Sequence, residues 1–509
     1  MSDFHSSKQF STFQVSNKQL KQGSLEENRL AKNVILFGIT SLSDIFLLLL
    51  LILSGRYLGV EDFGVFSLAL SLSTLLVFST DLGLDSLVIR RIAIQKNDAP
   101  YIINAISGWK LIITLIALFV YLGFIFFFLV DGPIRNTAII LGCAAIFRSI
   151  NMTLRAYFHA FENFLLESRV ILLERILLFS IGSLVVIFFP DPLTLAIIFL
   201  GSRLIATVTY IYLINKHICK ISPRIDFEFS KRFQIEAIPL GISALIFGVS
   251  MQVDTLILGV FRDVAEVGVF SATLKIYEGL LVVPLVINAV IYPRLAYLQL
   301  SMKDEFSKLF SRAYKYIMIL SMLVIMAGLL FHNEIMLILF GKKYMGGVDV
   351  LLLMVVAVGI QFQVSLLFTA MKAIGKLKEF MCFMLFGLLI RFMGDVLLIP
   401  YYGMYGAGIS ILVSVILTLI GVLYYSLKIG IDLHSISKKI LLVVLSFLIT
   451  IFVYIFVSHQ KNIIFEIGLV LVSYVVCLII FRVFDSKEFI LLRSLFCMVI
   501  RRVRSSKAC

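Results

Sequence analysis

The chain is poor in charge, in proline, in tryptophan and in cysteine. Only 15% of its 509 residues are charged, and it holds 9 Pro, 1 Trp and 6 Cys. Soluble domains carry about 25% charged residues, so the composition excludes an ordinary soluble domain. The cysteines are scattered without a C-x-x-C pair, which argues against a disulfide framework and against a zinc site of the usual spacing. The sequence G-x-x-x-x-G-K-[ST] does not occur, so ATP hydrolysis by this chain is not expected.

Apolar residues make up 60% of the chain, and its mean hydropathy is +1.03. They form long runs such as Leu111 to Val130, and a helix needs about 20 apolar residues to cross a bilayer core. Barrel strands would be shorter and would alternate with polar residues, so the runs predict an all-α membrane protein. Fourteen transmembrane helices are predicted, beginning near Val34, Phe66, Leu111, Thr137, Val170, Leu193, Ile238, Gly268, Tyr316, Val350, Phe380, Met404, Ile440 and Ile463.

The positive charges predict which side of the membrane each loop faces. Cytoplasmic loops carry an excess of Lys and Arg. An even number of spans places both termini on one side, and we predict that both are cytoplasmic. Most of the 45 Lys and Arg residues then lie inside, while the outer loops hold only Arg56, Arg135, Arg262, Lys342, Lys343 and Lys461. The net charge of +14 is explained by this topology, so no nucleic-acid partner is expected.

A short phrase occurs twice in the chain. Leu58-Gly59-Val60 leads into Gly64-Val65-Phe66-Ser67, and Leu258-Gly259-Val260 leads into Gly268-Val269-Phe270-Ser271. Duplicated membrane units are the usual plan of secondary transporters, because two repeats can rock around a central site. We therefore predict two six-helix lobes related by a pseudo-two-fold axis, followed by two further helices. The predicted boundaries are a polar cytoplasmic tail at 1–33, an N-lobe at 34–216, a basic cytoplasmic linker at 217–237, a C-lobe at 238–427, the last two spans within 428–482 and a basic cytoplasmic tail at 483–509.

The first phrase belongs to a longer stretch that matches one known family. Residues 54–67 read SGRYLGVEDFGVFS, and Asp81-Leu82-Gly83-Leu84 and Arg90-Arg91-Ile92-Ala93 follow. This order resembles the start of bacterial polysaccharide-biosynthesis transporters of the multidrug/oligosaccharidyl-lipid/polysaccharide (MOP) superfamily, especially Wzx-type O-antigen and capsule-unit flippases. Further matching segments are Asp254 to Gly259, Val267 to Ser271 and Ile399 to Gly408, so the resemblance covers essentially Leu30 to Leu427.

The resemblance implies a transporter of the bacterial cytoplasmic (inner) membrane, and not an enzyme. It implies a V-shaped cavity between the two lobes, through which an undecaprenyl-diphosphate-linked oligosaccharide is turned from the cytoplasmic to the periplasmic leaflet. In similar fourteen-span flippases the two extra helices flank a groove for the lipid tail. The implied partners are this lipid-linked oligosaccharide, membrane lipids, and a polysaccharide polymerase with its chain-length machinery. No cofactor and no metal are expected.

Three arginines in the predicted N-lobe are candidate substrate ligands, because charges inside a membrane are costly and therefore tend to be functional. Arg148 and Arg155 are seven residues apart, two turns on one face of the fourth span, and Arg203 lies on the sixth. Guanidinium groups bind phosphate oxygens well, so these residues are predicted to hold a diphosphate in the cavity. The alternative is that Arg155 extends to the cytoplasmic surface and that Arg148 pairs with Asp44 or Glu174.

Asp44 and Asp254 are candidate carriers of a coupling proton or cation. Pairing with a nearby arginine is the alternative role for each of them. Gln252 and Tyr277 could hydrogen-bond to sugars or stack on them, although interfacial tyrosines are commonly membrane anchors.

Two pairs of opposite charge have the spacing of helical salt bridges. Lys275 and Glu278 are three residues apart, and Arg391 and Asp395 are four apart. Each pair shares a helix face, so both are predicted to be structural ion pairs.

Two other functions remain open from the sequence. Multidrug or toxin exporters belong to the same superfamily but typically have twelve spans. A membrane-embedded glycan polymerase or transferase would need a sizeable outer loop with catalytic groups. The longest predicted outer link, near Phe331 to Gly347, offers only His332 and Glu334 for acid–base chemistry, so no catalytic residues are predicted.

Overall fold

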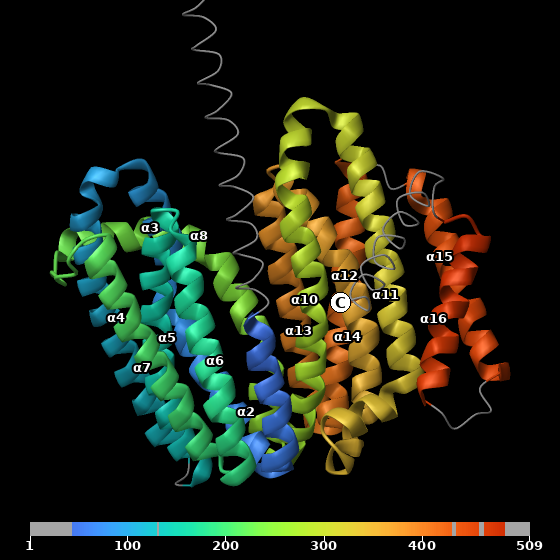
Figure 1. The fold of residues 1–509 in the computed structure, drawn as a ribbon, viewed down its shortest axis with the longest axis horizontal. Coiled ribbons are helices and arrows are strands. Elements are labelled where there is room, and N and C mark those ends of the chain that lie inside the picture. Colours follow the sequence, from blue (N-terminus) through green and yellow to red (C-terminus); the bar gives the residue numbers. More distant parts are fainter. Residues whose placement is uncertain (1–42, 130–131, 430–433, 458–462, 484–509) are drawn as a thin grey trace, which may run out of the picture. The chain divides into compact units, whose positions relative to one another are not determined.

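The computed structural model describes residues 43–129, 132–429, 434–457 and 463–483. The predicted polar N-terminal tail, the start of the first span near Val34 and the predicted basic C-terminal tail beyond residue 483 lie outside these ranges. Within them the regular structure consists of helices without a strand (Figure 1), which confirms the all-α fold.

The described helices follow one another with short links. In chain order they are a helix over residues 43–58, α2 (Val60–Asp81), α3 (Leu84–Ile94), η1 (Lys96–Asp98), α4 (Ala99–Phe128), α5 (Pro133–Ala160), α6 (Phe164–Phe188), α7 (Pro192–His217), α8 (Phe227–Ser250), α9 (Val253–Phe261), α10 (Val264–Ser301), α11 (Lys303–Leu339), η2 (Lys342–Gly347), α12 (Val348–Ala373), α13 (Leu377–Tyr402), α14 (Met404–Lys428), α15 (His434–Val457) and α16 (Ile463–Ile480).

Local sequence explains where several of these helices begin. Pro133 and Pro192 stand in the first turns of α5 and α7, where a missing N–H costs nothing. The Asp191 side chain caps α7 by accepting a hydrogen bond of 2.8 Å from the N–H of Thr194. Between α2 and α3 the chain turns at Leu82 and Gly83, both with left-handed backbone, so the two helices form one interrupted span.

Each of the fourteen predicted spans coincides with a helix in the described part of the chain. Twelve helical segments there are long and apolar enough to cross a bilayer. The helix over residues 43–58 and the shorter apolar stretch Phe465–Ile480 coincide with the first and the last predicted spans. Some helices are longer than their apolar runs: the third span was predicted to begin near Leu111, whereas α4 begins at Ala99.

The predicted topology can be tested with truncated reporter fusions. Fusions after Arg232 and after Arg262 should report cytoplasmic and outer locations respectively, because one complete span, Ala244–Phe261, separates the two residues. A reporter that is active only outside the cytoplasm and one that is active only inside should give opposite results at each site. The same side for both fusions would contradict the topology.

The described chain divides into two compact units. Unit 1 comprises the residues up to Gly279 together with Met336–Gly347 and Arg391–Ala407. Unit 2 comprises Leu280–Ile335, Val348–Ile390 and the residues from Gly408 onward. This division follows contacts and does not test the predicted repeats, so the six-helix lobes and their boundaries stay a prediction.

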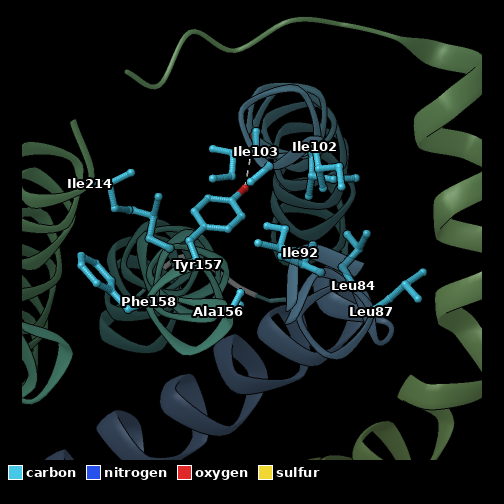
Figure 2. Close-up of a cluster of buried hydrophobic side chains, with 14 of the residues drawn as sticks. Leu84, Leu87, Ile92, Ile102, Ile103, Ala156, Tyr157, Phe158 and Ile214 are labelled. Atoms are coloured by element: carbon cyan, nitrogen blue, oxygen red, sulfur yellow. Dashed lines mark hydrogen bonds between the residues drawn. The ribbon is translucent and has the colours of Figure 1, made fainter. Parts of the chain in front are cut away.

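Unit 1 has a continuous apolar core around α5. This helix packs against α2, α3, α4 and α7. The buried Tyr157 lies at the centre of the core and contacts side chains from α3, α4 and α7 (Figure 2). Its hydroxyl group bonds to Ser107 at 3.0 Å and also approaches the carbonyl oxygen of Ile103. The core therefore holds the helices that carry the predicted arginines in fixed register.

The predicted basic linker, 217–237, divides into a non-helical segment, 218–226, and the first turns of α8, and the non-helical segment is tied to α4. Asn104 accepts two hydrogen bonds from it: its carbonyl oxygen from the N–H of Arg224 at 3.0 Å, and its side-chain oxygen from the N–H of Ser222 at 2.7 Å. Tyr101 donates to Asp226, which also caps α8, and these hydrogen bonds hold the pKa of the Asp226 carboxyl below its usual range. These hydrogen bonds therefore hold the segment 218–226 against α4.

The repeated glycine phrases meet in unit 1. A Cβ atom on Gly64 would overlap the carbonyl oxygen of Val264, and a Cβ atom on Gly268 would overlap that of Val60. The contact is reciprocal, since each glycine faces the residue four positions before the other one. It brings the backbones of α2 and α10 together, so these two glycines serve close helix approach rather than turn-making. Gly59, with a φ of 89°, makes the turn before α2.

In unit 2 the last two helices pack against α11. Val443 of α15 and Tyr474 of α16 are buried in an apolar cluster with Met326 and Phe331 of α11. The Tyr474 hydroxyl group donates to the carbonyl oxygen of Ile319 at 3.2 Å. Residues from Phe331 to Leu339, predicted as part of an outer link, belong to α11 and follow a bend at Phe331. His332 and Glu334 are therefore helical residues and not loop residues.

Candidate functional site

Four arginines and three carboxylates converge on α5, α6 and α7 of unit 1. We call this set the arginine cluster. The arginines lie on α5, α6 and α7, and the carboxylates lie on α6 and on the helix over residues 43–58. Its members are Arg148, Arg155, Arg175, Arg203, Asp44, Glu167 and Glu174.

Arg203 forms the most buried ion pair of the cluster. Its guanidinium group bonds to Glu174, and both side chains are only 7% exposed. Asn151 fixes this part of α7, because its amide donates to the carbonyl oxygen of Arg203 at 3.1 Å and its side-chain oxygen accepts from Thr207 at 2.7 Å. Arg203 is therefore neutralised and held in place by α5 and α6.

Arg155, near the C-terminal end of α5, pairs with the buried Glu167 in the first turn of α6. The distance from Nε to the carboxylate is 2.9 Å, and the same carboxylate lies 2.7 Å from His159. The Arg155 side chain is 39% exposed, so it reaches the surface of unit 1 while paired. The position of Arg155 agrees better with the predicted alternative, in which it extends to the surface, than with the prediction that it binds phosphate inside the cluster.

Arg175 takes the remaining carboxylate. Its Nη2 atom lies 2.8 Å from Asp44, which comes from the helix over residues 43–58. The sequence-based alternative paired Arg148 with Asp44 or Glu174, and that pairing was wrong. The structure uses these carboxylates for Arg175 and Arg203, because helix packing and not chain spacing decides which charges meet.

Arg148 is left without a carboxylate of its own. Arg148 is half-buried on α5. Among the described residues, the three carboxylates of the cluster form their ion pairs with Arg155, Arg175 and Arg203 instead. Arg148 lies within electrostatic range of Arg175, Arg203, Glu174 and Asp44. Three carboxylates face four guanidinium groups, so the cluster carries one uncompensated positive charge and Arg148 is its open member.

A second buried ion pair lies elsewhere in unit 1. Arg391 forms a bidentate pair with Asp254, which is fully buried on α9. The predicted pairing of Arg391 with Asp395 was therefore incomplete, because the closest carboxylate comes from a helix 137 residues away in the chain. Pairing with an arginine was the predicted alternative role of Asp254, and the structure shows this pairing. Ion carriage by Asp254 stays a prediction. Lys275 and Glu278 form the predicted ion pair, at 2.7 Å.

The two predicted sugar-contacting residues lie outside the helices that carry the arginine cluster. Gln252 is half-buried at the turn between α8 and α9. Tyr277 on α10 is 2% exposed, which leaves its ring enclosed by protein. Their contact with sugars stays a prediction.

Sequence reasoning gave two members of the cluster no specific role. Arg175 counted only as one of the charged residues within the predicted spans, and Glu167 was not considered. No spacing rule links Arg175 to Asp44, or Glu167 to Arg155 and His159. The signal that could have found Arg175 is its position beside Glu174, inside the same apolar run. Among the described residues no group of His, Cys, Asp and Glu has the geometry to hold a metal ion.

Solved structures with the same arrangement of helices are transporters. Lipid II flippase MurJ in an inward closed conformation matches with a TM-score of 0.75 at 15% identity, covering 88% of this chain and 99% of that one. A multidrug resistance MATE family transporter of the MOP superfamily, in an inward-facing conformation, matches with a TM-score of 0.63 at 15% identity, covering 78% and 98%. A MOP superfamily transporter from Pyrococcus furiosus Vc1, described by the reversed polarity of its binding pocket, matches with a TM-score of 0.54 at 15% identity, covering 78% and 96%.

The chain thus shares the all-α fold of these transporters. A search of curated proteins by sequence finds no match. The model of the family described as polysaccharide biosynthesis protein matches residues 30–299, more than half of the sequence, and the chain belongs to this family.

Proposed function

We propose that this protein is a flippase for an undecaprenyl-diphosphate-linked oligosaccharide, such as a repeat unit of O-antigen, capsule or a similar surface polysaccharide. It moves this substrate from the cytoplasmic to the outer leaflet of the bacterial inner membrane by alternating access. The family and the MurJ-like fold support transport of a lipid-linked glycan. A polysaccharide polymerase and its chain-length machinery are the proposed partners downstream of the transfer.

The observation that carries this proposal is the uncompensated charge on Arg148. An arginine in a membrane protein costs free energy unless an anion or water solvates it. A diphosphate supplies several charged oxygens in a geometry that guanidinium groups bind in pairs. Arg148 is the primary phosphate ligand in this proposal. Arg203 adds positive charge from its fixed position beside Glu174, and Arg155 adds charge at the end of α5.

The same charge argues against export of organic cations by this chain. A positive drug would be repelled by a cluster with four guanidinium groups and three carboxylates. The Pyrococcus furiosus relative is described by a binding pocket of reversed polarity that suggests a different function, so pocket charge differs between members of this superfamily. A polymerase or transferase is less well supported, because its only candidate acid–base residues, His332 and Glu334, lie within α11 and not in an outer loop.

Reversal of the charge at Arg148 tests the proposal. Arg148→Glu should reduce surface polysaccharide by at least tenfold in cells that depend on this protein, because an added carboxylate repels the diphosphate. The amount of surface glycan and the amount of protein in the membrane fraction are measured together. Arg169→Glu, the same change at an exposed position of α6, is the matched control and should leave glycan unchanged. Normal glycan in Arg148→Glu cells with normal protein would remove Arg148 from the site.

A further inference from the structure

The guanidinium group of Arg175 is only partly used. Its Nη2 atom bonds to Asp44 at 2.8 Å. Its Nε and Nη1 atoms are buried and have no hydrogen-bond partner among the residues that the structure describes. A buried donor without an acceptor is destabilising, and more so when the group is charged. Arg175 therefore presents two donors that the protein itself leaves unmatched.

The carboxylate that Arg175 does hold is easily released. The Asp44 side chain is 58% exposed, whereas that of Arg175 is 12% exposed. An exposed ion pair is worth much less than a buried one, so an exposed carboxylate loses less when it leaves its partner. Glu174 differs, since it is 7% exposed and would have to break the buried pair with Arg203. Of the carboxylates near Arg148, Asp44 is thus the one that can be exchanged.

We propose that Asp44 occupies an anion subsite on Arg175, and that a phosphate group of the substrate displaces it. This inference rests on the proposed function and adds Arg175 as a second phosphate ligand beside Arg148. A phosphate can accept hydrogen bonds on several oxygens at once, so it can satisfy donors of Arg175 that one Asp44 oxygen leaves unmatched. The exchange also replaces one anion by another next to Arg148 and Arg203, so Arg175 is not left without a negative partner.

The carboxylate then acts as a competitor that sets affinity. Without Asp44 the arginines would hold a diphosphate too tightly for release on the other side of the membrane. With Asp44 the departing phosphate is replaced at once by an internal anion. Asp44 is in this view a specificity and release residue, and not the ion carrier considered from the sequence.

Binding of farnesyl diphosphate to the detergent-purified full-length protein, measured by calorimetry, tests the competition. Asp44→Asn should bind this probe about tenfold more tightly than the unmodified protein, because the competing anion is gone. Asp44→Glu keeps a carboxylate and should bind like the unmodified protein. In the double variant Asp44→Asn with Arg175→Gln the gain should disappear. This double variant leaves no stranded charge, so its folding can be verified by thermal unfolding before binding is measured.

The control is Glu278→Gln, which removes one carboxylate from the ion pair with Lys275 and should leave affinity unchanged. Unchanged affinity in Asp44→Asn, or a gain that persists without Arg175, overturns the inference. Either result leaves the proposed function standing if Arg148→Glu still abolishes both binding and surface glycan. Failure of every form to bind farnesyl diphosphate overturns the diphosphate site and the competition together.

Discussion

Asp254→Asn is expected to be strongly destabilising. The change leaves Arg391, 7% exposed, without the carboxylate that it binds through two hydrogen bonds. Removal of one partner from a buried ion pair costs about 3–5 kcal/mol, because the remaining charge stays buried. We expect a value near the lower end, about 3 kcal/mol, since Asp395 lies one turn along α13 and also stabilises the positive charge. The free energy of unfolding of the detergent-purified protein is the quantity to measure.

The double variant Asp254→Asn with Arg391→Gln distinguishes two causes of instability. One is the unpaired buried charge of Arg391, which this variant removes, and the other is the loss of the Asp254 carboxylate itself. Two neutral amides can still hydrogen-bond, so most of the lost stability should return. Unchanged stability of the single variant would show that Arg391 is solvated in some other way. The double variant also tests ion carriage by Asp254. If it still transports lipid-linked sugar with an unaltered response to imposed pH and Na⁺ gradients, the pair is structural and the carrier hypothesis fails.

Gly64→Ala and Gly268→Ala should each force α2 and α10 apart. The added methyl group overlaps a main-chain carbonyl oxygen, of Val264 or Val60, which cannot rotate away like a side chain. Overpacking of this kind typically costs about 1–3 kcal/mol. Transport should fall more steeply than stability, because these residues join the first and second copies of the repeated phrase at one helix crossing. The measurements are thermal unfolding and surface polysaccharide for the two variants.

Gly201→Ala is the matched control for this prediction. No atom lies within 4 Å of a Cβ added there, in the middle of α7. Alanine is favoured over glycine in a helix by about 1 kcal/mol, so this variant should be as stable as the unmodified protein or more so. Equal behaviour of Gly64→Ala and Gly201→Ala would show that the α2–α10 contact is not tight.

The exposed fraction of their side chains divides the paired charges of unit 1 into two kinds. The pairs of Arg203 with Glu174 and of Arg391 with Asp254 are almost fully enclosed, which suits them to structural roles. In the pair of Arg175 with Asp44 the carboxylate is exposed, and Arg148 is half-buried without a carboxylate of its own, so both fit the proposed exchange with a ligand. Exposure therefore distinguishes a binding arginine from a structural one more clearly than its residue type does.

The sequence alone determined the spans and the class of protein. The bilayer requires about 20 apolar residues for each crossing, so each hydrophobic run predicts a span without knowledge of its neighbours, although not the breaks within a span such as the one between α2 and α3. The order of the glycine-rich phrases was sufficient to recognise the family. It was not sufficient to show that Gly64 and Gly268 face each other, because that contact depends on how two distant helices cross.

Only the tertiary structure decided which charges meet. Helical spacing correctly paired Lys275 with Glu278, because both residues lie on one helix, α10. The same rule chose Asp395 for Arg391, whereas packing of α13 against α9 supplies Asp254. Ion pairs between helices depend on the rotation and depth of each helix, and a single sequence does not contain these quantities in readable form. For that reason Arg148 could be named as a candidate from its position, but its uncompensated charge appeared only after the carboxylates had been assigned to other arginines.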